Sequence, residues 1–341
     1  MLKFGIIGLG GMGCAHASSI ETLGGRVTAG ADPREQSRKA FAEAYPQAKT
    51  FERYEDMLGL KLDAVVVATP TYLHCEQITA AAKAGAHVFC EKPMCMTVAE
   101  ADKILEATKK VKFMMAFCRR FDNHWGKVRE VLLSGRVGRP VLWRHCAAGA
   151  GPGPNRQWFY DRKQGGGPLV DGAVHNYDFA HWTFGKPVSV YASMKRFKKD
   201  STALDTGTAI IKFKSGDELM CCWSWGLPWN TSALSLIDIL GPDGALFFDA
   251  PQDRLPQGFD PQKQGAIRSV REGKEEIHVF TKNNMYIDEM KHFIECVEQD
   301  KQLAADGLTG KVGAQIACAV IQSAETGKIV KIGPAKAPRK K

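Results

Sequence analysis

The sequence predicts an α/β protein of two domains: a doubly wound parallel sheet, then an α/β domain with a large, mainly antiparallel open sheet. Short apolar runs alternate with helix-like segments up to about residue 118. A glycine-rich turn follows the first of these runs. Beyond residue 118 the apolar segments lengthen and short turns separate them, which favours antiparallel pairing. The predicted domains are residues 1–118 and 119–333.

The first domain is expected to alternate strands and helices. Nearly continuous apolar strands between helices are typical of a parallel sheet that is covered on both faces. Strands are expected at Phe4–Gly8, Val27–Ala31, Lys49–Phe51, Ala64–Ala68, Ala86–Cys90 and Phe113–Phe117. Helices are expected at Cys14–Leu23, Arg34–Tyr45, Arg53–Leu58, Tyr72–Ala84 and Val98–Lys109.

The second domain is expected to begin with a connecting helix, Phe121–Leu133, and to close with two helices, Met285–Gln299 and Gly310–Thr326. Residues Pro251–Ser269 are rich in Pro, Gln and Gly and predict a long loop. Several expected strands alternate apolar and polar residues, so one sheet face is buried and the other is partly open. These strands are Val141–Ala147, Val188–Phe197, Thr206–Lys214, Glu218–Trp225 and Leu234–Leu240.

The first turn, Gly8-Leu9-Gly10-Gly11-Met12-Gly13, has the spacing of a dinucleotide-binding turn between a strand and a helix. Gly8 allows the tight turn, Gly10 lets the backbone approach a pyrophosphate, and Gly13 lets the helix pack on the strand. Asp32 ends the next apolar run, where a carboxylate binds a ribose 2′-hydroxyl and repels a 2′-phosphate. The pattern predicts a Rossmann domain that binds NAD, and Arg34 keeps NADP open as the alternative.

The loops after the strands are the next candidate binding segments, because ligands of doubly wound folds bind beyond the carboxyl ends of the strands. Thr69 and Pro70 follow the Ala64–Ala68 run and are expected to lie along the cofactor. Lys92 follows the Ala86–Cys90 run and is expected where nicotinamide and substrate meet. A solvated surface lysine is the alternative interpretation of Lys92.

A second group of polar residues follows the triple glycine Gly165–Gly167. A helix is expected to begin near Val170, so that Asp171, His175 and Asp178 share one face. A carboxylate four residues before an imidazole can hold one tautomer and raise its basicity, which makes a usable general base. A polar histidine on an amphipathic helix is the alternative. Metal ligation is disfavoured, because the sequence has no C-x-x-C or H-E-x-x-H motif.

The composition is typical of a soluble globular protein, with 44% hydrophobic and 24% charged residues. No apolar run approaches the ~20 residues that span a membrane, and no leader precedes the first strand, so neither a membrane nor a signal peptide is expected. Ten cysteines, mostly among apolar residues, favour free thiols in a reducing cytoplasm. Part of the net charge of +9 lies in the tail 334–341, which is expected to be disordered, and no basic run interleaved with aromatics indicates nucleic-acid binding.

With these motifs in this order, the chain resembles the glucose–fructose oxidoreductase / inositol 2-dehydrogenase / MocA family over nearly its whole length. The resemblance implies a Rossmann domain, a second domain whose open sheet forms dimers or tetramers, a tightly held nicotinamide cofactor, and a sugar, inositol or related polyol as substrate. The matching residues are the Gly8–Gly13 turn, Asp32, Ala68–His74, Glu91-Lys92-Pro93, Arg119–Asp122, Gly165–Gly167, Asp171 and His175.

Residue by residue, the resemblance assigns catalysis to Lys92, Asp171 and His175. His175 is expected to take the hydroxyl proton, Lys92 to stabilise the charge on the same oxygen, and Asp171 to orient the pair. Substrate contacts are expected from Arg120, Trp158, Asp171 and His175, and a cis peptide bond is expected at Lys92-Pro93. The expected cofactor-binding residues are Gly8, Gly10, Gly11, Met12, Gly13, Asp32, Arg34, Ala68, Thr69, Pro70, His74, Glu91 and Lys92.

The function expected from these residues is hydride transfer between a polyol hydroxyl and NAD by a cytoplasmic homodimer or homotetramer. Two alternatives stay open. One is a glycosidase that cleaves its substrate by transient oxidation and elimination, and the other is a non-catalytic dinucleotide-binding regulator.

Overall fold

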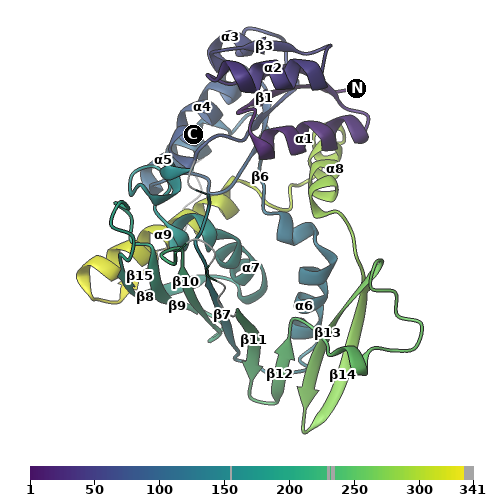
Figure 1. Cartoon of the computed structure of the whole chain (residues 1–341), viewed down its shortest axis with the longest axis vertical. Helices are drawn as coiled ribbons and strands as arrows, with labels where there is room; N and C mark the ends of the chain where they lie inside the picture. The colour runs from purple at the N-terminus through teal and green to yellow at the C-terminus, as the bar shows by residue number, and fades with distance from the viewer. Residues whose placement is uncertain (154–155, 229–230, 232–234, 334–341) are drawn as a thin grey trace. The chain divides into compact units, whose positions relative to one another are not determined.

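The computed structural model describes residues 1–153, 156–228, 231 and 235–333 of the chain (Figure 1). These residues form two compact units. The first contains residues 1–118 and 285–314, and the second contains residues 119–284 and 315–333. The tail 334–341, which is expected to be disordered, lies outside the described residues.

In the described part of the first unit, six strands form a parallel sheet in the order β3-β2-β1-β4-β5-β6. Residues Ala64–Val67 of β4 are fully buried, as the apolar run predicts. This is the doubly wound order, with its switch point between β1 and β4, so the predicted fold class is confirmed. The strands are β1 Lys3–Ile7, β2 Arg26–Ala31, β3 Lys49–Phe51, β4 Ala64–Val67, β5 His87–Cys90 and β6 Phe113–Met115.

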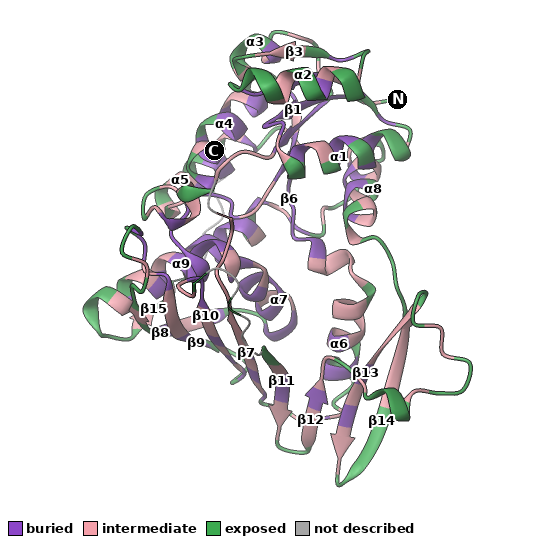
Figure 2. Cartoon of the chain, in the orientation of Figure 1, coloured by how far each residue is buried: buried purple, intermediate pink, exposed green. Residues whose placement is uncertain are grey.

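Helices separate these strands along the chain, and one helix from the C-terminal part of the chain also belongs to this unit. They are α1 Gly11–Thr22, α2 Glu35–Ala44, α3 Tyr54–Leu58, the 3₁₀ turn η1 Thr71–Leu73, α4 His74–Lys83, α5 Val98–Ala107 and α8 Met285–Glu298. Helix α8 packs on α1 (Figure 1). Its Phe293 lies against two sheet residues, with ring centroids 6.5 Å from Phe4 and 5.5 Å from Phe89. All three rings are fully buried, and Figure 2 colours the strands of this sheet mainly as buried.

In the described part of the second unit, nine strands form a sheet in the order β14-β13-β12-β11-β7-β10-β9-β8-β15. The pair β7 and β10 is parallel and the other neighbours are antiparallel, so the prediction of a mainly antiparallel sheet is confirmed. The strands are β7 Leu142–Ala148, β8 Pro187–Lys195, β9 Thr206–Phe213, β10 Glu218–Ser224, β11 Leu236–Gly241, β12 Gly244–Phe247, β13 Gln264–Arg271, β14 Lys274–Thr281 and β15 Val330–Lys331.

Two helices of the second unit, α6 Asn123–Leu133 and α7 Val174–Phe184, pack together near β7. The Trp125 ring of α6 lies 4.7 Å from Phe179 of α7 and 5.8 Å from Trp143 of β7. The remaining elements are α9 Gly307–Thr326 and the short turns η2 Cys118–Phe121, η3 Gln157–Tyr160, η4 Pro168–Gly172 and η5 Gln252–Arg254.

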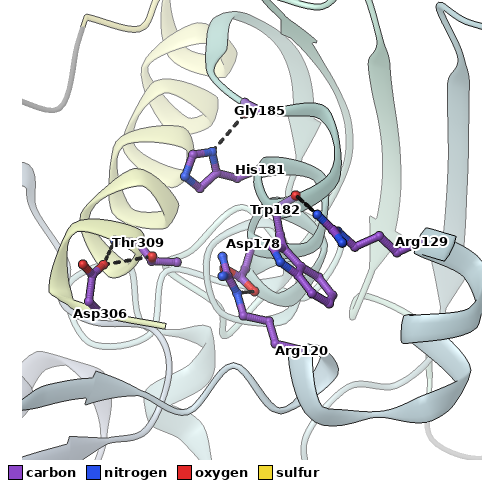
Figure 3. A network of polar contacts seen from close by, with 8 residues as sticks. All are labelled: Arg120, Arg129, Asp178, His181, Trp182, Gly185, Asp306 and Thr309. Carbon is purple, nitrogen blue, oxygen red and sulfur yellow. Dashed lines mark hydrogen bonds and ion pairs between the residues drawn. The ribbon is translucent and has the colours of Figure 1, made fainter. Parts of the chain in front are cut away.

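The predicted loop Pro251–Ser269 is wrong at its C-terminal end, where β13 begins at Gln264. The side chains of β13 are mostly half-exposed and many are polar, so the sequence shows no strand pattern here. The strand forms because β12 and β14 pair with it on both sides. The last predicted helix also starts earlier, at Gly307. In the first unit, Asp306 accepts hydrogen bonds at 3.0 Å from the amide and the hydroxyl of Thr309 (Figure 3), which satisfies one donor at this helix end.

Among the described residues, no helix is both long and apolar enough to cross a bilayer.

Candidate active site

The glycine turn after β1 is shaped by close backbone approaches. Gly8 has a φ of +92°, and a Cβ there would lie 2.7 Å from the carbonyl oxygen of Ala68. A Cβ at Gly13 would overlap the carbonyl oxygen of Gly8. By contrast, a Cβ at Gly11 would meet nothing within 4 Å, and one at Gly10 would meet only the Arg34 guanidinium, at 3.9 Å. The turn is therefore packed on its inner side and open beside Gly10 and Gly11.

This open side coincides with the start of α1, whose N-cap is Gly10. The first turn of the helix carries no acidic residue, and its Met12 side chain is 38% exposed. Free N–H groups and the positive end of the helix dipole favour an anion at this point. The residues present thus fit the pyrophosphate of a dinucleotide.

Asp32 ends β2 and is buried, with hydrogen bonds to both carboxylate oxygens. Leu9 donates its N–H to Oδ2 at 3.0 Å, and Arg34 donates its backbone N–H and its Nε to Oδ1 at 2.9 and 3.0 Å. Burial by itself raises the pKa of Asp32, but the hydrogen bonds from Arg34 and Leu9 outweigh it and lower the pKa. Asp32 is therefore a carboxylate at neutral pH. The Arg34 side chain is 66% exposed, so it can leave Asp32 at little cost.

His74, the first residue of α4, connects the loops that follow β4 and β5. Its Nε2 lies 2.8 Å from the carbonyl oxygen of Thr69, and its Nδ1 lies 2.7 Å from that of Pro93. Thr69 in turn donates its hydroxyl to Gln77 of α4 at 2.5 Å. Pro70 is the N-cap of η1 and ends the extended segment after β4, as predicted.

Glu91 and Lys92 follow β5 directly. The Glu91 carboxylate lies 2.8 Å from Nε2 of the fully buried His16 and accepts the Lys92 backbone N–H at 3.1 Å. Burial raises the pKa of Glu91, but His16 and Lys92 together lower it below its usual value, so the carboxylate is charged. The peptide bond between Lys92 and Pro93 is cis, as the resemblance predicts.

In the second unit, the triple glycine leads into the widened turn η4 rather than directly into a helix. Gly167 has a φ of +86°, and a Cβ there would lie 2.5 Å from the carbonyl oxygen of Leu204. Asp171 is buried within η4, which has π-helical hydrogen bonding, while His175 is half-buried in the first turn of α7. The helix expected to start near Val170 thus begins at Val174. Asp171 and His175 therefore lie in two successive elements rather than in one continuous α-helix.

Arg120 forms a buried ion pair with Asp178 of α7 (Figure 3). Its Nε lies 2.9 Å from Oδ2 and its Nη2 lies 2.7 Å from Oδ1. Beside this pair, Arg129 stacks 4.3 Å from the Trp182 ring and points to its carbonyl oxygen (Figure 3). Asp178 lies on α7, the helix that carries His175, and its carboxylate is paired with Arg120. The predicted contact of Arg120 with the substrate stays a prediction.

Strands β7 and β10 place further polar and aromatic groups beside α7. The Asn176 amide donates to the Cys221 thiol at 3.5 Å and accepts a hydrogen bond from Arg119. His145, opposite Cys221 in the sheet, stacks on the half-buried Trp223 with ring centroids 5.4 Å apart. Burial, together with the charge of Arg119, lowers the pKa of His145 to about 3, so its ring is neutral.

Trp223 also faces the turn that carries Asp171. A Cβ on Gly172 would lie 3.5 Å from the Trp223 indole, in van der Waals contact, and 3.0 Å from the Trp225 indole, so both rings pack closely on this turn. Gly172 and His175 are three residues apart, which places Trp223 near the start of α7. The predicted aromatic contact, Trp158, lies on η3 and stacks on Phe159 with ring centroids 3.7 Å apart.

The structure thus brings the predicted cofactor residues together at the carboxyl ends of the first sheet, and it places Asp171 and His175 one after the other in the second unit. Sequence patterns missed His145, Asn176 and Trp223. The apolar context of the two strands is visible in the sequence, but the register that puts His145 opposite Cys221 is not. Among the described residues, no group of three or more His, Cys, Asp or Glu side chains could hold a metal ion.

The doubly wound sheet, its open glycine turn and the buried Asp32 are the features of a Rossmann domain that binds a nicotinamide dinucleotide. The chain belongs to the GFO/IDH/MocA oxidoreductase family: residues 2–117 match the model of its NAD-binding Rossmann fold, and residues 125–247 match its C-terminal domain.

Relatives match over nearly the whole chain. A myo-inositol 2-dehydrogenase of Thermotoga maritima is 27% identical and covers 97% of this chain and 98% of its own. A D-glucoside 3-dehydrogenase of Escherichia coli K12 is 27% identical and covers 97% of both chains. The crystal structure of a probable dehydrogenase from Thermotoga maritima superposes with a TM-score of 0.76 at 27% identity, and it covers 97% of this chain and 99% of its own.

Proposed function

We propose that the protein is an NAD-dependent dehydrogenase that transfers a hydride between a hydroxyl-bearing carbon of a sugar, inositol or related polyol and the nicotinamide. Relatives that span the chain are named as dehydrogenases of myo-inositol and of D-glucosides, which supports this substrate class. One observation carries the proposal: Lys92 follows β5 of the NAD-binding domain, and Asp171 and His175 follow a glycine-rich turn, so all the groups that the reaction needs are present.

When bound, NAD supplies the hydride acceptor. The hydroxyl must lose its proton as the carbon–hydrogen bond breaks, and His175 takes that proton as a general base. Lys92 donates a hydrogen bond to the same oxygen and offsets its developing negative charge. Asp171 orients the imidazole and stabilises it after the proton has moved.

We assign NAD as the cofactor in preference to NADP because of Asp32. Its lowered pKa keeps it charged at neutral pH, and a buried carboxylate repels a 2′-phosphate. In this proposal Arg34 leaves Asp32 when the ribose hydroxyls take its place. Gly8, Gly10, Gly11, Met12 and Gly13 would hold the pyrophosphate, and Ala68, Thr69, Pro70, Glu91 and Lys92 would line the nicotinamide end, with the buried His74 supporting the Thr69 backbone.

On the substrate side, we propose contacts from Asp171, His175, Arg120 and Trp158, and we add Trp223. The Trp223 ring is half-buried beside Gly172, and its neutral neighbour His145 adds no charge behind it. Such a ring offers a flat apolar surface to the C–H face of a cyclic polyol, while charged groups form hydrogen bonds with its hydroxyls.

We propose that a second copy of the chain covers the open face of the nine-stranded sheet, giving a homodimer or homotetramer. The side chains Tyr191, Ile210 and Met220 stand side by side across β8, β9 and β10. Tyr191 is 45% exposed, and the other two are half-buried. An apolar row of this kind fits an apolar partner surface. The free cysteines fit the reducing cytoplasm that we propose as the compartment.

The test is NADH formation measured by absorbance with a panel of inositols, sugars and sugar acids. Lys92→Ala and His175→Ala should each lower turnover by about 10²-fold, the usual contribution of a positioned acid–base group. Lys39→Ala, at an exposed helix position, serves as the matched control and should keep full activity. Full activity in both site variants would refute the assignment.

The same assay separates the two alternatives. Release of a sugar from a glycoside without net NADH would favour elimination chemistry. Tight NAD binding with no turnover of any compound would favour a regulator.

A further inference from the structure

His74 has a hydrogen-bonding pattern that a neutral histidine cannot satisfy. The side chain is fully buried, and both of its ring nitrogens face backbone carbonyl oxygens, Thr69 at 2.8 Å and Pro93 at 2.7 Å. A carbonyl oxygen only accepts hydrogen bonds. A neutral imidazole has one N–H and one lone pair, whereas an imidazolium has two N–H groups. Both contacts are therefore hydrogen bonds only if the ring is protonated on both nitrogens.

Two half-buried histidines of the first unit, His87 and His292, show the opposite chemistry. His87 accepts the backbone N–H of Lys112 on Nδ1 at 2.9 Å, and His292 accepts the N–H of Ala304 on Nε2 at 3.0 Å. An acceptor nitrogen carries no proton, so both rings are neutral. His87 and His292 thus provide internal references for a neutral ring within the same unit.

The two acceptors of His74 belong to segments that the reaction uses. Thr69 follows β4 in the loop proposed to line the cofactor, and Pro93 directly follows Lys92. On the other side of Lys92, the carboxylate of Glu91 is held by His16 at 2.8 Å. The backbone around Lys92 is therefore fixed by one buried histidine on each side.

We propose that His74 is a positively charged positioning residue that ties the cofactor loop at Thr69 to the Lys92–Pro93 segment and so sets where Lys92 stands. This inference rests on the proposed role of Lys92 in hydride transfer. Burial and the helix N-terminus both disfavour a cation at this position. Two short hydrogen bonds from a charged donor to fixed carbonyls oppose that cost, and such bonds are about twice as strong as neutral ones. His74 acts through Lys92 and needs no contact with the substrate.

The charge is tested by ¹⁵N NMR of the full-length protein labelled at histidine, at pH 7. In an imidazolium both ring nitrogens carry protons and resonate close together, whereas in a neutral ring the bare nitrogen resonates far downfield. The spectrum should show His74 in the first class and His87 and His292 in the second, with assignments from His→Gln variants. A neutral signature for His74 would overturn the proposal.

The positioning role is tested with His74→Phe, which keeps a ring but has no donor, and His74→Gln, which keeps N–H donors. We expect kcat at saturating NAD and substrate to fall by about 10²-fold in H74F, as it does when a catalytic group is displaced by about 1 Å. We expect kcat of H74Q to be at least tenfold higher than kcat of H74F. In both variants KM for the substrate should change far less than kcat. His87→Phe, at the opposite end of β5 from Lys92, is the control and should keep wild-type kcat.

A folded H74F variant with wild-type kcat would overturn the positioning role, and so would an H74Q variant no better than H74F. If H74F does not fold, the H74Q kinetics and the NMR signature still decide the question. If His74 shows an imidazolium signature but the protein oxidises no polyol, the charged state of His74 is supported and the proposed function is refuted.

Discussion

Glu289 should make the stability of the protein fall as the pH rises. This residue of α8 is fully buried, and neither carboxyl oxygen has a hydrogen-bond partner among the described residues. Burial, with a smaller contribution from the charge of Glu91, raises the pKa of Glu289 well above 4.5. The folded protein therefore holds a proton on Glu289 that the unfolded chain releases above about pH 4.5.

The sign and size of the effect follow from proton linkage. Because the folded pKa is raised, this contribution to stability is complete below the unfolded pKa and is lost as the pH rises toward the folded pKa. In that window the folded state binds one more proton, so the free energy of unfolding falls by about 1.4 kcal/mol per pH unit. Glu289→Gln cannot ionise and removes this slope.

The assay is urea unfolding at several pH values for the wild type, Glu289→Gln and the control Glu298→Gln. Glu298 lies on the same helix but is exposed, so its substitution should leave the slope unchanged. The stability of the wild type minus that of E289Q should decline with pH by about 1.4 kcal/mol per unit. A difference that stays constant from pH 5 to pH 8 would show that the Glu289 carboxyl is not buried as described.

Three further outcomes are expected. Asp32→Ala should bring the affinity for NADP to or above that for NAD, because Arg34 is then free to meet a 2′-phosphate; unchanged discrimination in calorimetric titrations would refute the role of Asp32. Trp223→Ala should raise KM for the polyol by up to about tenfold with little change in NAD affinity, and an unchanged KM would remove Trp223 from the site. Asp178→Asn should destabilise the second unit by about 3–5 kcal/mol in denaturant unfolding, because it leaves the buried Arg120 charge uncompensated; a loss below about 1 kcal/mol would mean that water reaches Arg120.

The first sheet could be predicted from the sequence because its strands are buried on both faces. Ala64–Val67 is wholly apolar and buried, and helix patterns flank it, so local residues determine its state. Strands β13 and β14 could not be predicted in the same way. Their half-exposed residues, such as Lys274–Thr281, look like a polar loop until a neighbouring strand supplies the pairing.

The candidate site likewise contains residues that local sequence patterns identify and residues that they do not. Gly8, Gly13 and Asp32 could be found because each acts within a few residues of its own strand end. The stack of His145 on Trp223 depends on pairing residues 78 positions apart, which no local pattern encodes. The turn η4 also has no local sequence signal, because a π-helical segment of five residues has no distinctive hydrophobic period.

Deuterium transfer tests the central claim most directly. The protein is incubated with NAD and a polyol that it oxidises, deuterated at its ring carbons, and the NADH formed is analysed by mass spectrometry. Direct hydride transfer predicts NADH that carries one deuterium from the substrate, formed at least about 10²-fold more slowly by His175→Ala. NADH without deuterium, or a released sugar with no NADH at all, would contradict direct hydride transfer.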